Sequence, residues 1–408
     1  MELVEIFKTL VKIPSPSMAE EAVAKKIIEI LTEAGIKTRK DSYGNVYAEY
    51  DGGNQDKPPL LLSSHMDVVG DDSPVNIVER DGFIETDKTR TLGADDKAGV
   101  AAILKLFLDM KAETDKLSDG EKPLYGRLEA VFTRDEENSM TGIENVEFNN
   151  LNSEYVLVLD SDKLGNFEIS GAGYIKLTIS VKTPYGGHSG LDISDEKRLN
   201  AAKLIAEIIE KVPQGVQKAD ETGTITSVNL GSVIGGGVEN AFYEAVKRNL
   251  KGKAAVEFVA KNSMSNIINT SAFAHYSLRS SDINAQDVLI SKIKDIILAF
   301  NEKYQGLAEA KLEIEEHLPV FEKAGDDFLI NVAKKAAGAL GVDLKIQSFH
   351  AGAETHIYAN RKNAQNLAFK PVLAGIADVF NMHSSDEKID IESYKKGYEF
   401  LKAFVKEL

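Results

Sequence analysis

The sequence contains no cysteine, which excludes disulfides, thiolate nucleophiles and cysteine-bound zinc. A metal site in this chain must therefore be built from His, Asp and Glu. The chain also lacks an apolar run of about 18 residues, which a membrane-spanning helix needs. Its first residues, Met1-Glu2-Leu3-Val4-Glu5, have neither the basic start nor the apolar core of a signal peptide. We therefore expect a cytoplasmic protein with no membrane partner.

Basic residues are also in deficit, with 48 Lys and Arg against 64 Asp and Glu and a formal net charge of −16. A nucleic-acid partner is not expected, because binding phosphate requires a clustered basic surface. A hydrophobic fraction of 43% and a charged fraction of 27% are typical of a globular protein and exclude disordered and collagen-like classes. At 408 residues the chain exceeds the size of most single cores, so we expect two domains.

The first part of the chain alternates helical and strand-like segments. A helix is predicted from Ser17 to Gly35, with Ser17 as its cap, Glu20 at the capping-box position and Gly35 as its stop. Apolar runs of strand length follow at 60–64, 128–132 and 155–159, and a second helix is predicted at 97–110. Strands that are apolar on both faces favour an α/β domain with a mainly parallel central sheet. In such sheets ligands bind beyond the carboxyl ends of the strands.

From about Tyr174 the pattern changes to the alternation of a half-exposed antiparallel strand. The predicted order becomes strand, helix, strand, strand, helix, strand, at 175–181, 200–212, 224–230, 272–278, 285–300 and 310–314. That order is typical of a ferredoxin-like α+β domain. A helix at 328–340 and a strand at 371–376 follow Pro319. We therefore predict a discontinuous α/β catalytic domain, residues 1–173 and 318–408, interrupted by an inserted α+β lid and dimerisation domain, residues 174–317.

Histidine and carboxylate residues stand where the predicted elements meet one edge of the sheet. Three segments follow predicted buried strands: His65-Met66-Asp67, Glu136-Glu137 and Asp160. Gly93-Ala94-Asp95-Asp96-Lys97 opens the predicted helix between them, and His383 follows a further apolar run near the C-terminus. Each alone has an ordinary interpretation, such as a chance His-x-Asp or a solvated pair of acids. Their joint position at one sheet edge instead indicates a metal site, and imidazole among the ligands favours zinc over magnesium or calcium. We interpret Asp71, Asp72, Asp135 and Asp162 as solvated surface acids.

These motifs, together with Gly187-His188-Ser189-Gly190, resemble the motif series of the cocatalytic zinc peptidases, which include peptidase T, carboxypeptidase G and aminoacylase. The peptidase T-like branch fits best. The resemblance implies two Zn²⁺ per subunit, or other divalent ions such as Co²⁺ or Mn²⁺. It implies that Asp95 bridges both ions, that His65 and Asp160 complete one site, and that Glu137 and His383 complete the other. Asp67 would then fix the tautomer of His65, and Glu136 would act as general base.

The resemblance also implies substrate-binding residues outside the metal site. His188 would reach the active site of a partner subunit and stabilise the oxyanion, which implies a homodimer. Arg279 would bind a substrate carboxylate, although on sequence alone it could equally be a surface charge at a strand end. Asn266 would contact substrate, with Asn240 as an alternative. The remaining candidates lie in a glycine-containing loop. Gly352 would bind substrate there, and His350, Glu354 and His356 are further candidates.

One stretch departs from the family pattern. Residues 238–265 separate the glycine cluster at 235–237 from Asn266, where relatives often have only a few residues. We interpret this stretch as an extra helical element that limits substrate length.

The function that these features predict is aminopeptidase-type hydrolysis of short peptides, such as dipeptides and tripeptides. An N-acyl or N-carbamoyl amino-acid amidohydrolase is the first alternative, and Arg279 cannot separate the two because both substrates carry a carboxylate. An inactive homologue that binds metal or peptide is the second. The presence of both Glu136 and Asp67 argues against it, since a binding protein needs no proton shuttle.

Overall fold

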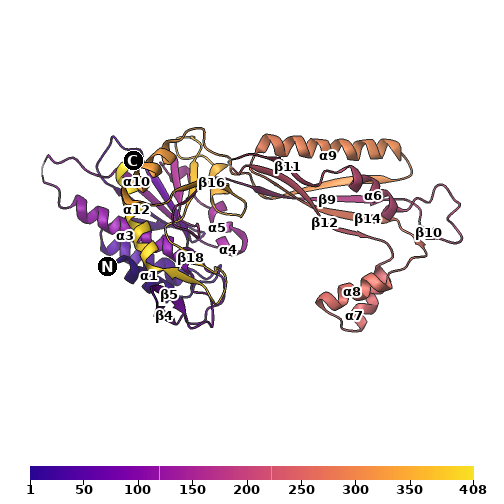
Figure 1. Cartoon of the computed structure of the whole chain (residues 1–408), viewed down its shortest axis with the longest axis horizontal. Helices are drawn as coiled ribbons and strands as arrows, with labels where there is room; N and C mark the ends of the chain where they lie inside the picture. The colour runs from indigo at the N-terminus through magenta and orange to yellow at the C-terminus, as the bar shows by residue number, and fades with distance from the viewer. Residues whose placement is uncertain (119, 222) are drawn as a thin grey trace. The chain divides into compact units, whose positions relative to one another are not determined.

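The computed structural model describes residues 1–118, 120–221 and 223–408, and these form two compact units (Figure 1). Unit 1 comprises Met1–Gly171 and Phe321–Leu408, and unit 2 comprises Ala172–Val320. The predicted domain limits, 173/174 and 317/318, lie within three residues of the boundaries between these units. Each of the buried apolar clusters lies within a single unit.

Unit 1 contains an eight-stranded sheet in the order β1-β2-β6-β3-β7-β17-β8-β16. Its strands are β1 (Lys37–Lys40), β2 (Val46–Asp51), β3 (Leu60–His65), β6 (Arg127–Thr133), β7 (Tyr155–Val158), β8 (Asn166–Gly171), β16 (Lys345–Phe349) and β17 (Lys370–Ala374). The central pairings of β3 with β6 and β7, and of β7 with β17, are parallel. The prediction of a mainly parallel central sheet is therefore confirmed.

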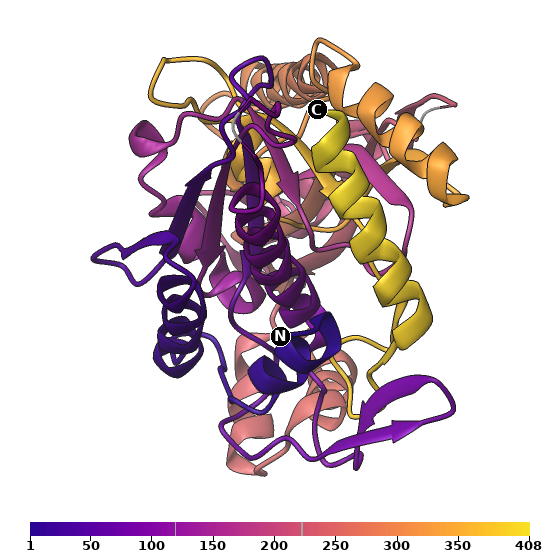
Figure 2. The same cartoon turned by 90° about the vertical axis from the view of Figure 1, so that its left-hand side faces the viewer.

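Helices cover this sheet on both faces, because successive residues of each strand point in opposite directions. In β3, Leu60 and Leu62 pack into one apolar cluster and Leu61 into another. The first face carries α1 (Leu3–Val11), α2 (Glu21–Glu33), α3 (Ala94–Thr114), α10 (Phe328–Leu340) and α12 (Ile391–Glu407). The second carries α5 (Thr141–Glu144), the 3₁₀ turn η1 (Phe148–Asn150) and α11 (Thr355–Ala359), with the short helix α4 (Glu136–Ser139) just before α5. In Figure 2, α3 and the yellow α12 lie beside each other.

The predicted capping of α2 by Ser17 is wrong. The helix begins only at Glu21, and neither Ser17 nor Glu20 makes a side-chain cap bond. Ser17 instead contacts Asp67, and Glu20 contacts Arg134 and Asp135. The rest of the prediction holds, since Val23, Ile27, Ile30 and Leu31 form a buried stripe and Gly35 stops the helix with a φ of +74°, which glycine adopts readily.

A second, smaller sheet in unit 1 was not predicted. Its order is β18-β19-β5-β4, from β4 (Ile77–Arg80), β5 (Phe83–Thr86), β18 (Val379–Phe380) and β19 (Lys388–Asp390). Its two-residue and polar strands give no apolar run for sequence analysis to detect. The loop between β18 and β19 carries His383.

Unit 2 has the predicted ferredoxin-like order of elements. Its antiparallel strands β9 (Gly173–Lys182), β12 (Ile225–Gly235), β14 (Ser271–Ser280) and β15 (Glu309–Leu318) lie in the order β12-β14-β9-β15. Helices α6 (Ala201–Lys211) and α9 (Ile283–Lys303) pack on this sheet (Figure 1). An extra edge strand, β11 (Gly215–Ala219), was not predicted, because all five of its residues are exposed.

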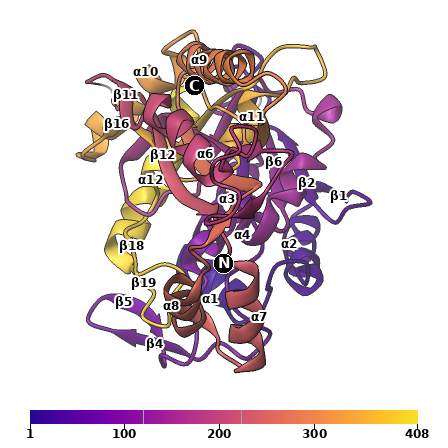
Figure 3. The same cartoon turned by 90° about the vertical axis from the view of Figure 1, so that its right-hand side faces the viewer.

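Within residues 238–265, helices α7 (Glu239–Lys247) and α8 (Gly252–Asn262) lie side by side (Figure 3). The prediction of an extra helical element is confirmed. The remaining strands, β10 (Gly187–His188) and β13 (Ile267–Ile268), form a two-stranded sheet. No helix in the described part of the chain has both the length and the apolar character needed to cross a membrane.

Candidate metal centre

The five predicted metal ligands meet beyond the carboxyl ends of the parallel strands of unit 1. His65 is the last residue of β3, Glu137 follows β6 and Asp160 follows β7. Asp95 lies at the start of α3, and His383 in the loop between β18 and β19. Parallel strands end at the same sheet edge, which explains how residues distant in sequence come together.

Asp95 lies at the centre of this group. Its Oδ1 is 3.1 Å from Nε2 of His65, and its Oδ2 is 3.0 Å from Nε2 of His383. On the first side, Oδ1 of Asp160 is 3.5 Å from His65 Nε2. On the second side, Oε2 of Glu137 is 3.1 Å from His383 Nε2. These distances place Asp160 nearest His65 and Glu137 nearest His383, with Asp95 in contact with both imidazoles.

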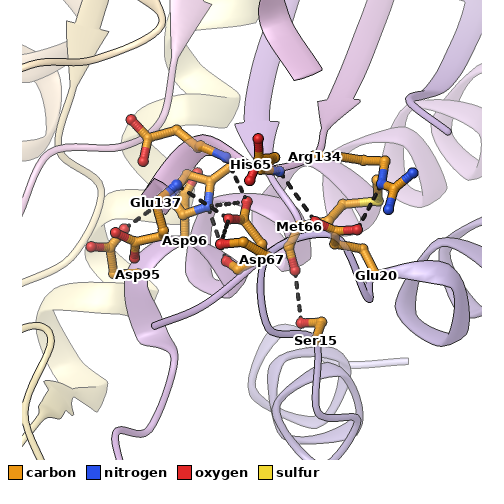
Figure 4. Close-up of polar contacts among 12 residues, drawn as sticks. Ser15, Glu20, His65, Met66, Asp67, Asp95, Asp96, Arg134 and Glu137 are labelled. Atoms are coloured by element: carbon orange, nitrogen blue, oxygen red, sulfur yellow. Dashed lines mark hydrogen bonds and ion pairs between the residues drawn. The ribbon is translucent and has the colours of Figure 1, made fainter. Parts of the chain in front are cut away.

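Asp67 contacts His65 from the opposite side of the ring (Figure 4). The backbone oxygen of Asp67 lies 3.0 Å from Nδ1 of His65, and its Oδ1 lies 3.4 Å from the same atom. A proton on Nδ1 is therefore accepted mainly by the backbone oxygen, which leaves Nε2 free to bind a cation. The carboxylate of Asp67 also accepts the backbone N–H groups of Glu136 and Glu137, at 3.0 and 3.1 Å.

The turn that presents Asp95 is held by Glu387. Its carboxylate accepts the backbone N–H groups of Gly93 at 2.8 Å and of Asp95 at 3.2 Å, and also the hydroxyl of Thr91. Gly93 has a φ of +76°, and a Cβ there would lie 2.7 Å from a methyl group of Val68. Only glycine fits this position without displacing its neighbours. The Asp95–Asp96 peptide bond is cis.

The crowding of acids at this site shifts their pKa values. Burial, followed by the Asp95 charge, raises the pKa of Asp160 to about 8 and that of Glu137 to about 7. Burial, with the charge of Asp160 adding to it, raises the pKa of Glu136 well above its ordinary value. The bond to Asp95 raises the pKa of His383 to about 9. The side chains thus form an acidic cluster that a doubly charged cation would neutralise.

The donor set fits divalent cations. Two imidazoles with carboxylates are ligands that zinc accepts readily. Oε1 of Glu137 is buried and accepts no hydrogen bond from the described residues, although its partner oxygen contacts His383. Buried acceptors are rarely left unpaired, so this oxygen suits a metal bond. Two overlapping groups have ligand atoms within 4.8 Å of one another: His65, Asp95 and Glu137, and His65, Asp96 and Asp160.

Asp96 belongs to the second group, but sequence reasoning gave it no role of its own. Its Oδ1 accepts the N–H of Gly99 at 3.1 Å, and its Oδ2 accepts the hydroxyl of Ser64. Both oxygens are therefore already used in shaping the first turn of α3. The interpretation of Asp135 as a solvated acid is wrong, since it is buried and accepts the hydroxyl of Thr141. Nothing local in the sequence distinguishes Asp96, Asp135 or Glu387 from surface acids.

The predicted substrate residues of unit 2 do not all lie together. Nε2 of His188 is 3.3 Å from Nδ2 of Asn266, and both line a cavity of 470 Å³ with Asn240. Arg279 lies eight residues beyond the start of β14, or about 27 Å along an extended strand. Its guanidinium lies over the ring of Tyr174, 4.8 Å from the centroid.

In unit 1, the predicted substrate loop leads into α11. Gly352 and His350 are exposed, whereas Glu354 is buried and accepts the hydroxyl of Ser63 at 2.9 Å. His356 is buried against the rings of Phe321 and Phe349, with centroids 5.8 and 5.5 Å away. His356 is therefore a packed residue, whereas His350, Ala351 and Gly352 are exposed.

Comparison with known proteins identifies the family to which these features correspond. The model of peptidase family M20/M25/M40 matches residues 61–407. The chain is 25% identical over 417 residues to the uncharacterized protein YqjE of Bacillus subtilis, covering 99% of this chain and 98% of the relative. It is 23% identical over 370 residues to peptidase T of Geobacillus thermodenitrificans, covering 88% of this chain and 75% of the relative.

Solved structures with the same fold include the aminopeptidase PepT of Bacillus cereus, with a TM-score of 0.79 and 22% identity over 99% of this chain and 97% of that one. Another is the YXEP protein of Bacillus subtilis, described as a dinuclear metal-binding peptidase of the M20 family. Its TM-score is 0.64, with 15% identity over 99% of this chain and 96% of that one. At these identities, the structural likeness shows the shared fold.

Proposed function

The chain belongs to peptidase family M20/M25/M40, is a metallopeptidase of the peptidase T-like branch, and we propose that it hydrolyses short peptides from their amino-terminal end. The observation that carries this proposal is the position of Asp95 between two His–carboxylate pairs, with Glu136 next to one of the ligands. Peptidase T among the relatives and an aminopeptidase among the structural neighbours support the choice of substrate class.

We assign two divalent cations, zinc by preference, to these residues. Asp95 would contact both, His65 and Asp160 would hold one, and Glu137 and His383 the other. When bound, the cations supply Lewis acidity, which polarises a peptide carbonyl and lowers the pKa of water.

Glu136 carries the proton in this proposal. Its carboxylate takes a proton from the attacking water and delivers it to the nitrogen of the leaving amine. Burial beside other acids raises the pKa of Glu136, which makes its carboxylate a better proton acceptor. Its backbone N–H is fixed by Asp67, so Asp67 orients the segment that carries it.

The roles of His188, Asn266, Arg279 and Gly352 in binding substrate remain predictions from sequence, as do the homodimer and the cytoplasmic location. His188 and Asn266 line one cavity, which supports a shared role. Arg279 is suited to a peptide carboxylate, because a guanidinium binds both carboxylate oxygens.

The proposal is tested by removing metal with a chelator, restoring single divalent ions, and assaying dipeptides, tripeptides, N-acetyl and N-carbamoyl amino acids. We expect peptide hydrolysis to disappear on chelation and to return with zinc. Faster hydrolysis of the acylated amino acids would favour the amidohydrolase alternative, and metal binding without turnover of any substrate would favour the inactive homologue.

The residue assignment is tested by Glu136→Gln, with Glu144→Gln as a control, since Glu144 is an exposed acid eight residues further along the chain. Glu136→Gln should fold and bind metal but lose at least about 100-fold in kcat, because proton transfer contributes about that much. Glu144→Gln should keep wild-type activity. A fully active Glu136→Gln enzyme would rule out Glu136 as the general base.

A further inference from the structure

Ser17 and Glu20, which the sequence pattern marks as a helix cap, make tertiary bonds instead: Glu20 contacts the segment that carries Glu136, and Ser17 contacts Asp67. Glu20 is fully buried. Its Oε1 accepts the backbone N–H of Asp135 at 3.2 Å. Its Oε2 accepts the Nε–H of Arg134 at 2.6 Å (Figure 4). Ser17 donates its hydroxyl to Oδ2 of Asp67 at 2.7 Å. Glu20 therefore connects the entry to α2 with the loop after β6, and Ser17 connects it with Asp67, which follows β3.

Three consecutive backbone N–H groups in that loop are held by two buried carboxylates. Glu20 accepts from Asp135, and Asp67 accepts from Glu136 and Glu137. Hydrogen bonds to a charged acceptor are the stronger kind, and within a buried site they fix the position of their donors. The residue before Glu136 therefore cannot shift without breaking the bond to Glu20.

The backbone of this loop depends on such support. Asp135 has a φ of +55°, a left-handed conformation that side chains other than glycine seldom adopt. The loop is closely packed on its far side, since a Cβ at Gly142 would lie 2.0 Å from the carbonyl oxygen of Arg134. The bonds from Glu20 to Arg134 and Asp135 therefore stabilise a conformation that is unfavourable on its own.

The entry to α2 is itself anchored to the segment after His65. Ser15 donates its hydroxyl to the backbone oxygen of Met66 at 2.8 Å, and its own backbone oxygen accepts the N–H of Val68 at 2.9 Å (Figure 4). Glu20 also accepts the N–H of Met18 at 2.7 Å, which fixes the turn between Ser17 and α2. Hydrogen bonds thus join the segment from Ser15 to Glu20 both to the residues after β3 and to the loop after β6.

We propose that Glu20 is a positioning residue for peptide hydrolysis, and that with Ser17 it holds the Asp135–Glu137 loop in the orientation that aims Glu136 at the reacting water. The inference rests on the proposed function, because it assigns Glu20 to the placement of that base. Glu20 acts through Arg134 and the backbone of Asp135, and does not itself touch substrate or metal.

The test uses the full-length protein with the substitutions Glu20→Ala and Ser17→Ala. The first measurement is hydrogen exchange of the 134–140 segment in metal-free protein, and the second is kcat and KM on a peptide that the wild type cleaves. We expect faster exchange in both variants. For Glu20→Ala we expect a kcat lower by about 10- to 100-fold with KM within about twofold, because misplacing a reacting group by about 1 Å has that effect. A smaller loss is expected for Ser17→Ala, which removes one bond.

Two substitutions in α2 serve as controls. Glu21→Ala removes an exposed carboxylate that pairs with Lys40 at 2.7 Å, and it should change neither exchange nor kcat. Ile27→Val removes a buried methylene, so it should lower Tm and leave kcat and exchange at 134–140 unchanged.

Wild-type exchange at 134–140 in Glu20→Ala and Ser17→Ala would overturn the inference. So would a kcat loss of equal size in Ile27→Val, since it would show that the effect arises from lower stability alone. If the wild type cleaves no peptide, the proposed function fails, while the exchange measurement still decides whether Glu20 and Ser17 hold the loop.

Discussion

Asp67 contacts both the first predicted metal ligand and the segment of the predicted base. Its backbone oxygen faces His65, while its two carboxylate oxygens accept the N–H groups of Glu136 and Glu137 and the hydroxyl of Ser17. Burial opposes ionisation of this carboxyl, yet the bond to His65 holds the pKa of Asp67 below its ordinary value. An ionised Asp67 is therefore a fixed acceptor for the backbone of the loop that carries Glu136.

Replacing Asp67 by Asn should affect catalysis more than metal binding. The backbone oxygen that faces His65 remains, so metal affinity should fall by about 10-fold, at the low end for the loss of such a contact. The carboxylate has two oxygens that accept the N–H groups of Glu136 and Glu137 and the hydroxyl of Ser17, whereas the amide of Asn has only one oxygen. Because the loop then loses part of its support, kcat should fall by about 100-fold. Calorimetric metal titration and steady-state kinetics measure the two effects. Asp72→Asn, at an exposed acid five residues away, is the control. Wild-type kcat in Asp67→Asn would contradict this role.

At the scale of elements, the sequence predicts well wherever an element buries its own side chains. All six residues of β3 are buried, so its apolar run was detectable, and the stripe of α2 is equally clear. Elements without such a pattern were missed, among them β1 and β11, whose residues are largely exposed. The predicted helix cap failed for another reason. The bonds that Ser17 and Glu20 make to Asp67, Arg134 and Asp135 cross more than 40 residues of chain, and such tertiary bonds leave no local signal.

The site was predictable in part for the same reason. His65, Glu137 and Asp160 follow recognisable strands, so a shared sheet edge could be inferred from their order. Asp95 opens a helix and His383 follows a short apolar run, so their signals were weaker, and the division of the five residues between two sites depended on the motif resemblance. Glu387, which holds the turn before Asp95, carries neither signal, because its neighbours in sequence are ordinary polar residues.

The packing of α3 against α12 depends on Glu113 in a way that pH should reveal. Burial opposes ionisation of Glu113, but its bonds to Lys402, Tyr125 and Lys406, at 2.6, 2.7 and 3.0 Å, lower its pKa to about 2. A pKa below that of the unfolded chain stabilises the fold fully above about pH 4.5, and the contribution is lost as pH falls towards 2.

Glu113→Gln should therefore lower the free energy of unfolding by about 1 kcal/mol at pH 7, since the pairs are partly exposed. The difference from wild type should shrink between pH 4.5 and 2. Urea unfolding of metal-free protein at pH 7, 5 and 3.5 measures it, with Glu33→Gln, at an exposed acid near the end of α2, as the control. A difference that stays constant down to pH 3.5 would show that the ion pairs contribute nothing.

At the scale of the whole molecule, the insertion of unit 2 leaves unit 1 locally continuous. Gly171 and Phe321, the residues that flank the insertion, pair as an antiparallel bridge, with N···O distances of 2.8 and 3.2 Å in the two directions. Residues that exchange both bonds in this way have Cα atoms about 5.5 Å apart. A few residues of linker can therefore join them without distorting the sheet.

Replacing residues 173–319 with a short Gly-Ser linker should yield a folded unit 1, because its apolar clusters contain no residue of unit 2. All five predicted ligands remain, so two divalent ions should bind with affinity within about 10-fold of wild type, as calorimetry would measure. Peptide hydrolysis should fall by more than about 100-fold, because His188, Asn266 and Arg279 are removed together. Residues 172–320 alone should fold cooperatively around their own core, which circular dichroism would detect. Loss of metal binding in the folded, shortened protein would show that the ligand set extends into unit 2, and retained hydrolysis would remove those three residues from the mechanism.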